Sequence, residues 1–342
     1  MDKEIWCASA PSFYGGADTE LYHQIILWRK NNIDVNIVPN TIDSIDPKML
    51  QKVINLGCKI HKYSPNVFKD KIVVSYCNGV ALKRLEEIYK FPPRCFIWFN
   101  CMTWTFEDEI KGIENGWITH IGFISNYQKN ILIEEYLKKI SKEIPKDIEY
   151  YPFFDISGYD VFEKNNDYFG IGRISRDDPG KFSKDCWEIF DRVLSPMDKK
   201  VFILGYSSKI EEKIGKPPNG LDWMWWQGGS ISSEEFYKKI DVMIHKTGGS
   251  RESYCRVFIE AMAHGIVPLV ERNYAFPEIL LESKDLDWLM CSSSDEMSYK
   301  ASCLAFDNNK LIAFKNMCRE YVEKYIINEN KSIDCWLKLL NE

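Results

Sequence analysis

Short apolar runs alternate with longer amphipathic segments along the whole chain. In the first half, the runs EIWCASA, DVNIVP, KIVVSY, RCFIWF and HIGFIS have the length and the β-branched and aromatic content of strands. Helical patterns such as TELYHQIILWRKN and YQKNILIEEYLKKI lie between them. This alternation predicts a parallel sheet that is covered by helices on both faces.

The same alternation restarts after the loop YYPFFDISGYDVFEKNN. The strand candidates of the second half are DYFGIGRI, KVFILGY, WMWWQ, VMIHK and IVPLV. Helices are expected near Cys186, Ile210, Phe236, Ile259 and Ile279. The tail, residues 310–342, has a helical pattern that is interrupted at INENKS before IDCWLKLL. The chain is therefore predicted to be an α/β protein of two doubly wound domains in tandem, with a boundary between residues 155 and 165.

Length and composition agree with two folded domains. The 342 residues are more than one hydrophobic core usually serves, and the 45% of apolar residues and 11 tryptophans supply material for two cores. The mean hydropathy of -0.31 and the lack of any apolar run near ~18 residues argue against a membrane span. The N-terminal stretch MDKEIWCASAPSFYGG has no long apolar core of a secretory signal, so a cytoplasmic protein is expected.

The net charge argues against one class of function, and the cysteine pattern indicates the state of the thiols. The 44 basic and 50 acidic residues give a net charge of -6, which lacks the electrostatic footprint of a general nucleic-acid binder. The 11 cysteines are scattered without a CxxC pair, so reduced and mostly buried thiols are expected.

One carboxylate stands inside an otherwise apolar helix. In the segment ESYCRVFIEAMAHGIVP, residues 252–268, Glu260 has apolar neighbours on nearly every side. A charged glutamate in such a helix costs several kcal/mol unless a partner supplies hydrogen bonds. The partner is either an internal Arg or Lys, or a ligand.

The segment before this helix favours the ligand. HKTGGSRES follows a strand, contains two glycines and leads into a helix that is expected to begin near Ser253. A strand, a glycine loop and a helix N-terminus form a common phosphate-binding arrangement. Glu252 lies in this loop and Glu260 one to two turns inside the helix, so two carboxylates would flank one phosphate group and accept hydrogen bonds from hydroxyls on either side of it. A ligand with a sugar on each side of a diphosphate is a nucleotide-sugar, so this class of ligand is expected.

These residues resemble the signature of the GT-B-fold glycosyltransferases, specifically the retaining enzymes of family 4. That signature is Glu, seven residues, Glu, then Ala-Met-Ala-x-Gly-x-Pro, and the chain has Glu252, Glu260, the run 261–263, Gly265 and, one residue late, Pro268. A second family element, a strand that ends in Gly-Arg with a lysine several residues later, matches FGIGRISRDDPGK. The likeness covers residues 167–282 well and the first half weakly.

The resemblance implies a GT-B fold, in which two Rossmann-like doubly wound domains face a central cleft. Residues 1–158 would form the acceptor-side domain and residues 159–325 the nucleotide-sugar-binding domain. Residues 326–342 would form a helix that packs back on the first domain.

The resemblance also assigns roles to single residues. Arg173 and Lys181 would hold the donor diphosphate and act in catalysis together with Glu252, which would contact the transferred sugar, while Glu260 would bind the ribose hydroxyls. The expected donor-binding residues are Gly15, Gly16, Gly172, Arg173, Lys181, Ser230, Glu252, Ser253, Tyr254, Cys255, Arg256, Val257 and Glu260. Asn100, Thr103 and Trp104 are expected on the acceptor side.

The chain departs from the family pattern in two places. The family often has Gly-Phe-Gly after the first glutamate, where this chain has Ser253, Tyr254 and Cys255, which leaves less room in the phosphate loop. The usual first-domain histidine before an acidic residue is absent, and Asn100 and Cys101 stand at its place in FNCMTWTFEDE.

Two further features have a structural and a functional interpretation. His245, in VMIHKTGG, lies near the predicted site, but a lone histidine at a strand end is more often structural than a donor contact. The aromatic run at residues 223–226 favours core packing of a strand over a platform for sugar stacking.

The sequence thus predicts a retaining glycosyltransferase that moves a hexose or deoxyhexose from a nucleotide-diphosphate sugar to a glycan or other hydroxyl acceptor. No cofactor, no metal and no nucleic-acid partner is expected, and a lipid-linked acceptor would place the protein at a membrane surface. The alternatives are a nucleotide-sugar hydrolase or epimerase of the same fold, or a non-catalytic partner subunit.

Overall fold

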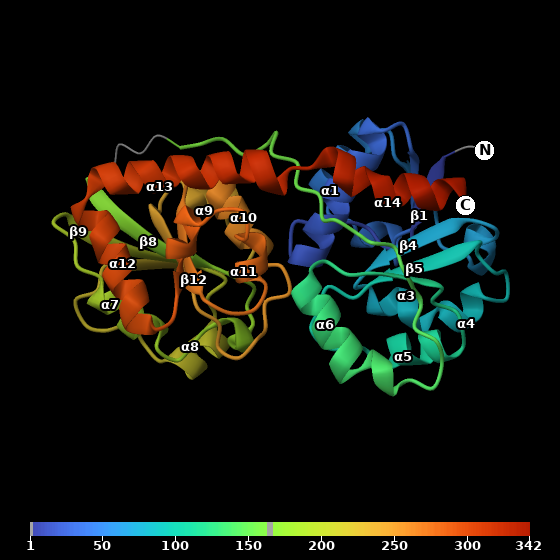
Figure 1. The fold of residues 1–342 in the computed structure, drawn as a ribbon, viewed down its shortest axis with the longest axis horizontal. Helices are drawn as coiled ribbons and strands as arrows, with labels where there is room; N and C mark the ends of the chain where they lie inside the picture. The colour runs from blue at the N-terminus through green and yellow to red at the C-terminus, as the bar shows by residue number, and fades with distance from the viewer. Residues whose placement is uncertain (1–2, 163–166) are drawn as a thin grey trace. The chain divides into compact units, whose positions relative to one another are not determined.

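The computed structural model describes residues 3–162 and 167–342 (Figure 1). The chain divides into two compact units, Met1–Asp155 with Asn328–Glu342, and Ile156–Ile327. Each unit contains a parallel sheet with helices around it, so the predicted α/β class is confirmed. The boundary expected at residues 155–165 includes positions 163–165, which lie outside the described residues.

The first unit contains a seven-stranded sheet in the order β3-β2-β1-β4-β5-β6-β7, and every pair in it is parallel. The strands are β1 (Glu4–Cys7), β2 (Asp34–Ile37), β3 (Lys59–Ile60), β4 (Ile72–Tyr76), β5 (Cys95–Phe99), β6 (His120–Gly122) and β7 (Lys146–Asp147). All five predicted strands are present. The edge strands β3 and β7 have two residues each, too few to produce a periodic signal.

Helices of the first unit connect these strands. They are α1 (Gly16–Lys30), α2 (Pro47–Asn55), α3 (Gly79–Lys83), α4 (Leu85–Ile88), α5 (Glu107–Glu114), α6 (Asn126–Glu135) and α14 (Glu329–Asn341), with short 3-10 turns at Ile42–Ser44, Pro65–Phe68 and Leu137–Lys139. Buried residues of β4 and β5, among them Val73, Phe96 and Trp98, form the centre of one hydrophobic core with side chains of α3, α4 and α5. Helices cover the central strands, so these strands are buried and appear in the sequence as apolar runs.

The last helix, α14, belongs to the first unit. Its Trp336 is fully buried, lies edge-on to Trp28 of α1 with ring centroids 4.8 Å apart, and donates a hydrogen bond from Nε1 to Gln24 Oε1 at 3.0 Å. The helix begins at Glu329 rather than after INENKS, because the Asn328 side chain caps it by accepting a hydrogen bond from the backbone N–H of Lys331. The predicted interruption, residues 327–332, was thus too long.

The second unit contains a six-stranded parallel sheet in the order β10-β9-β8-β11-β12-β13. The strands are β8 (Tyr168–Ile174), β9 (Asp198–Leu204), β10 (Trp223–Trp226), β11 (Val242–His245), β12 (Val267–Glu271) and β13 (Met290–Cys291). The helices are α7 (Cys186–Arg192), α8 (Ser208–Ile214), α9 (Ser233–Tyr237), α10 (Arg256–Ala263), α11 (Phe276–Ile279), α12 (Ser294–Phe306) and α13 (Asn308–Tyr321), with 3-10 turns at Pro179–Lys181 and Asp285–Leu289 and a π-helical turn at Val322–Ile326. Every strand and helix predicted in this half is present, but the two-residue β13 and the thirteen-residue helix α12 were not predicted.

Two details of the second unit correct the sequence analysis. Helix α10 begins at Arg256 and not near Ser253, because Cys255 adopts a left-handed conformation with φ of 57° just before it. Strand β10 lies at the sheet edge, and Met224 and Trp225 are 52% and 43% exposed. The prediction that this strand packs in the core is therefore wrong for Met224 and Trp225.

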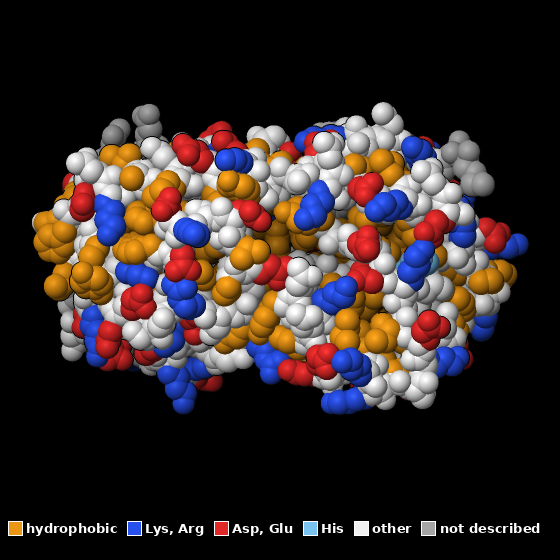
Figure 2. Space-filling model, viewed as in Figure 1, with side chains coloured by type: hydrophobic (Ala, Val, Ile, Leu, Met, Phe, Trp, Pro, Cys, Tyr) orange, Lys and Arg blue, Asp and Glu red, His pale blue; other side chains and the backbone are white. Residues whose placement is uncertain are grey.

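The surface agrees with the composition. On the face shown in Figure 2, acidic and basic side chains are interspersed over both units. All eleven cysteines are free thiols, and nine of them are buried. No helix within the described ranges has the length and apolar character that crossing a bilayer requires.

Burial of Trp336 predicts that it anchors α14 to the first unit. Trp336→Ala should lower the free energy of unfolding by about 3–5 kcal/mol, because it leaves a large cavity beside Trp28 and strands the buried Gln24 amide oxygen. Urea unfolding followed by circular dichroism measures the change. Lys338→Ala, at an exposed position of the same helix, should change it by less than about 0.5 kcal/mol. Equal unfolding midpoints for the two variants would contradict this assignment.

Candidate functional site

The second unit has a topological switch point between β8 and β11. The chain leaves β8 toward β9 on one side of the sheet, and it leaves β11 toward β12 on the other. Ligands of open α/β sheets bind outside the carboxyl ends of the strands at such a point. Arg173 lies near the carboxyl end of β8, and His245 is the last residue of β11.

Three side chains meet on one carboxylate at this point. Glu252 is 6% exposed, and its Oε1 lies 2.9 Å from Lys181 Nζ and 3.0 Å from His245 Nε2. Both contacts are to the same oxygen. The other oxygen, Oε2, has no hydrogen-bond partner among residues 3–162 and 167–342.

The protonation states follow from burial and from these neighbours. Burial, followed by the positive charge of Arg173, lowers the pKa of His245 to about 4, so its ring is neutral at pH 7. Burial alone would raise the pKa of Glu252, but the hydrogen bond from His245 and the charge of Lys181 outweigh it and lower that pKa to about 2. The site at neutral pH therefore contains an ionised Glu252 and a neutral His245 that donates through Nε2.

Backbone contacts hold the Lys181 and Glu252 loops against each other. The N–H groups of Gly248 and Ser250 donate to the carbonyl oxygen of Gly180 at 2.9 and 3.0 Å. Lys213 Nζ donates to the carbonyls of both loops, at Gly248 (2.8 Å) and Pro179 (2.5 Å). A Cβ atom at Gly248 would lie 1.9 Å from the Phe182 carbonyl oxygen, so only glycine allows this approach.

Arg173 lies beneath these loops. It is 1% exposed, donates from Nη1 to the Ile244 carbonyl oxygen at 3.3 Å, and donates from Nη2 to the Lys181 carbonyl oxygen. Its Nε is buried without a partner among the described residues. In this structure the guanidinium supports the backbone of Lys181, and its predicted contact with a diphosphate would need that bond to open.

The N-terminus of α10 lies next to the same cluster. Its cap, Cys255, has its Sγ 3.7 Å from His245 Nε2, and burial raises the pKa of this thiol well above its usual range. A non-glycine residue with φ of 57° carries a conformational cost, which explains why the family pattern often has glycine there. Arg256 and Val257 are the first two residues of the helix, so their N–H groups have no acceptor within it.

Glu260 is buried as the sequence predicted, with 7% of its surface exposed. Burial raises its pKa, and the charge of Arg256 lowers it less. No hydrogen bond or ion pair to its carboxylate is present in the described parts of the chain. The sequence left open whether an internal Arg or Lys or a ligand pairs with Glu260. Within the described residues, the structure provides only the nearby charge of Arg256.

Other predicted donor residues have different surroundings. Gly172 is required by packing, because a Cβ atom there would lie 2.6 Å from Ile240 and 2.9 Å from Phe236. Ser230 lies exposed after β10, where its hydroxyl donates to the Gln227 carbonyl oxygen. The remaining four are Gly15 and Gly16, at the start of α1 in the first unit, and Ser253 and Tyr254, between Glu252 and α10.

The cluster of His245, Glu252 and Cys255 has ligand atoms within 4.8 Å of one another, which is close enough for a metal ion. However, the Lys181 ammonium already contacts the Glu252 carboxylate, and the charge of Arg173 lowers the pKa of His245. Both cations oppose a third one at this position. The electrostatics of the site favour an anion.

The expected acceptor-side residues lie in a loop of the first unit that follows β5. Asn100 is fully buried, and its Nδ2 donates to Glu109 Oε2 at 2.6 Å and to the Trp104 carbonyl oxygen at 2.9 Å. Gln128 of α6 donates to the Met102 carbonyl oxygen at 2.7 Å. This buried network fixes the loop, and it contains two residues, Glu109 and Gln128, that sequence analysis did not identify.

The loop has one strongly exposed aromatic side chain. Trp104 is 45% exposed and packs against Phe106 with ring centroids 4.6 Å apart, whereas Thr103 is buried. The buried Asn100 therefore stabilises the loop from its interior side. Of the three expected residues, Trp104 is the one with a surface that an acceptor could contact.

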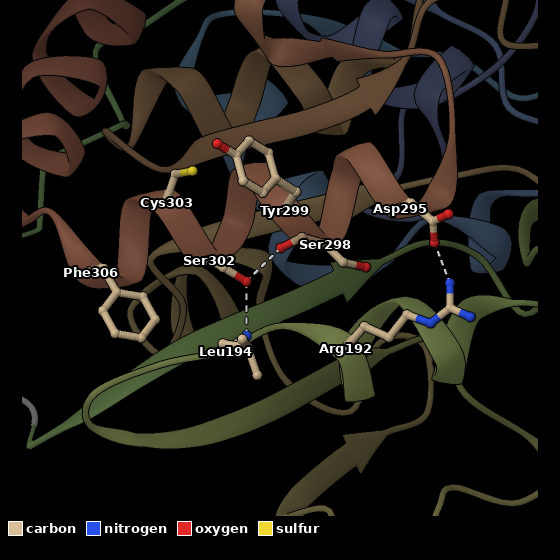
Figure 3. Close-up of a pocket in the computed structure, with 8 residues that line it drawn as sticks. All are labelled: Arg192, Leu194, Asp295, Ser298, Tyr299, Ser302, Cys303 and Phe306. Atoms are coloured by element: carbon tan, nitrogen blue, oxygen red, sulfur yellow. Dashed lines mark hydrogen bonds and ion pairs between the residues drawn. The ribbon is translucent and has the colours of Figure 1, made fainter.

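Two cavities lie outside these clusters. The larger one, of about 440 Å³, is an apolar hollow beside α12 in the second unit and contains no predicted site residue (Figure 3). It is lined by Arg192, Leu194, Asp295, Ser298, Tyr299, Ser302, Cys303 and Phe306. The smaller one, of about 280 Å³, lies between α5 and α6 and includes Thr105 at its edge.

Burial of Glu109 predicts a pH-dependent stability. Burial raises the pKa of Glu109 to about 7, so the folded state holds a proton that the unfolded state loses near pH 4.5. Stability should therefore fall as the pH rises from 4.5 to 7, and Glu109→Gln, which stays neutral, should be more stable than the wild type at pH 8 by on the order of 2 kcal/mol. Urea unfolding at pH 5 and pH 8 tests this, with the exposed Glu107→Gln as control. A Glu109→Gln gain that is equal at both pH values would contradict it.

Sequence comparisons find no match for this chain, whether among family models or among curated proteins. Comparison of structures does find similar proteins. HepE from Anabaena, in complex with UDP and glucose, is 13% identical with a TM-score of 0.69, and the match covers 100% of both chains. A variant of S. aureus TarM, in complex with fondaparinux, alpha-GlcNAc-glycerol and UDP, is 12% identical with a TM-score of 0.73 over 100% of both chains.

A glycosyltransferase from Rickettsia africae is also similar, at 12% identity and a TM-score of 0.69 over 99% of this chain and 98% of the other. These proteins are GT-B glycosyltransferases. At such low identity the likeness concerns the fold. The two parallel sheets, of seven and six strands, match it over the whole length. The chain therefore has the GT-B fold.

Proposed function

We propose that the protein is a retaining glycosyltransferase of the family 4 type, which moves a hexose or deoxyhexose from a nucleotide-diphosphate sugar to a glycan or other hydroxyl acceptor. The observation that carries this proposal is the meeting of Lys181, His245 and the N-terminus of α10 around the Glu252 carboxylate at the switch point of the second sheet. The structural neighbours that contain UDP or UDP-glucose support a nucleotide-sugar as donor.

Each group has a role in this reaction. The bond between the sugar's anomeric carbon and the diphosphate oxygen breaks, and its electron pair stays on the diphosphate. Lys181, the N–H groups at the start of α10 and the charge of Arg173 stabilise that oxygen. Glu252, through its unpartnered Oε2, accepts a hydrogen bond from a hydroxyl of the sugar as its ring gains positive charge. Glu260 accepts hydrogen bonds from the ribose, which satisfy a buried carboxylate.

The acceptor enters on the same face of the sugar that the diphosphate leaves. Its hydroxyl oxygen bonds to the anomeric carbon, and its proton goes to the departing phosphate oxygen, so the protein needs no base of its own. Trp104 offers an exposed aromatic face for a sugar acceptor. A lipid-linked acceptor would place this cytoplasmic enzyme at a membrane surface.

Two other activities use the same donor site. A hydrolase or epimerase of this fold would release or rearrange the sugar without an acceptor, and a non-catalytic subunit would not turn over at all. The buried Glu260 and the paired Glu252 favour an active enzyme over the subunit, because a buried carboxylate without a ligand only destabilises the fold. Product analysis with and without an acceptor separates the other two.

Donor binding without a metal is the first test. We expect the protein to bind UDP, or the diphosphate of its preferred base, with equal affinity in buffer and in EDTA, because Lys181 and helix N–H groups supply the positive potential. Lys181→Met should weaken binding by roughly 10- to 150-fold, the value of hydrogen bonds to charged groups. Calorimetric titration measures both effects, with the exposed Lys184→Met as control. Loss of binding in EDTA would sink the metal-free proposal.

The two glutamates should have separable effects. Glu252→Gln should lower kcat more than it raises KM, because its contacts with the sugar strengthen as the ring gains charge. Glu260→Gln should raise the donor Kd by about 10- to 150-fold with nearly normal kcat at saturating donor, because the ribose does not change during transfer. Steady-state kinetics and donor titration measure the two constants. Wild-type donor affinity in Glu260→Gln would mean that ribose does not contact this carboxylate.

A further inference from the structure

His245 contributes a hydrogen bond to the site that the charges around it do not replace. The ring is buried at the end of β11, and its polar contacts within the described residues are to Glu252 Oε1 at 3.0 Å and to Cys255 Sγ at 3.7 Å. Its Nδ1 is buried without a partner there. A ring nitrogen that donates to a carboxylate must carry the proton, so the neutral ring has its hydrogen on Nε2.

The hydrogen bond from His245 determines which carboxylate oxygen of Glu252 is available to a ligand. Lys181 and His245 both donate to Oε1 of Glu252, from different elements. Lys181 has a long flexible side chain, and the proposed function gives it a diphosphate to bind. The His245 ring is instead fixed by β11 and by edge-on packing against Phe276, with ring centroids 6.0 Å apart. Only His245 can thus keep Oε1 in place while Lys181 contacts phosphate.

We propose that His245 is a positioning residue for sugar transfer: its Nε2–H holds Oε1 of Glu252, so that Oε2 is directed to a hydroxyl of the transferred sugar. This inference rests on the proposed function of the site. Because the hydrogen bond acts on the contact with the sugar, it matters when the anomeric centre gains charge and not when the nucleotide binds. A histidine that served only to fill the core would affect neither step selectively.

The charged and titratable groups around the ring agree with a neutral donor. Arg173 from β8, Lys181 from the 3-10 turn before α7, Glu252 from the loop and Cys255 at the α10 cap all lie beside it. Two cations on one side make a protonated imidazolium unfavourable, while the carboxylate keeps the Nε2 proton in place. The ring can therefore orient Glu252 without neutralising it.

The test compares His245→Leu and His245→Gln. Donor turnover is measured as release of the nucleoside diphosphate from UDP-glucose and from the other common nucleotide-sugars, and affinity for the diphosphate of the preferred donor is measured by titration. We expect His245→Leu to lower kcat roughly 10- to 100-fold, while the donor KM and the Kd of the nucleoside diphosphate change by less than about threefold. His245→Gln, whose amide Nε2 can donate from nearly the same place, should recover most of the lost kcat. His120→Leu, in β6 of the first unit, is the control and should leave kcat unchanged.

The outcomes separate this inference from the proposed function. If the wild type binds no nucleoside diphosphate and releases none from any nucleotide-sugar, the proposed function fails. If the wild type is active and His245→Leu has normal kcat, or if affinity for the nucleoside diphosphate falls as much as kcat does, the positioning role fails alone. If His245→Leu does not fold, a His245→Gln variant no more active than His245→Asn, whose amide is too short to reach Glu252, overturns it. Elemental analysis is also decisive: a stoichiometric metal in the wild type that His245→Leu lacks would overturn the hydrogen-bond role.

Discussion

The arrangement of the candidate site depends on one buried carboxylate and the two donors that share its Oε1. Glu252 stays ionised although it is nearly buried, because the hydrogen bond from His245 and the charge of Lys181 outweigh the cost of burial. The fold makes these contacts to the carboxylate necessary. The carboxyl ends of β8 and β11 are adjacent at the switch point, so the loops that follow them must pack closely, and polar side chains of both are enclosed together.

The geometry of the two loops follows from this close packing. Gly248 allows one loop to approach the Phe182 carbonyl oxygen, and Lys213 joins the carbonyls of both loops. Arg173 supports the Lys181 backbone from below, which adds positive charge without exposing a guanidinium. These contacts preorganise an anion-binding position next to α10, and a preorganised position of this kind is the electrostatic requirement for a leaving diphosphate.

Sequence patterns were sufficient for most of the fold because apolar strands and amphipathic helices have distinct periods. They missed β3, β7 and β13, which have two residues each and whose pairing depends on neighbouring strands rather than on their own composition. The helix α12, Ser294–Phe306, was also not predicted. In the site, Glu252 and Lys181 were identified from their place in the motif. His245 was judged structural, since the sequence gives no sign that its ring would meet a carboxylate seven residues away.

Other residues of the site depend on contacts that no local pattern encodes. Gly172 fits a family motif, yet its surroundings show that packing against Ile240 requires it. Lys213 and Glu109 act through partners 34 and 9 residues away, in loops whose approach only the folded chain reveals. The charge that makes Glu260 unusual was visible in the sequence, whereas the weakness of its protein partner was not.

A crystal structure of the protein with a bound nucleotide-sugar tests the central claim most directly. The account predicts the diphosphate at Lys181 and the N–H groups of Arg256 and Val257, the ribose hydroxyls at Glu260, and a sugar hydroxyl at Oε2 of Glu252 while His245 still donates to Oε1. A nucleotide bound elsewhere on the second unit, or a sugar that does not contact Glu252, would contradict it.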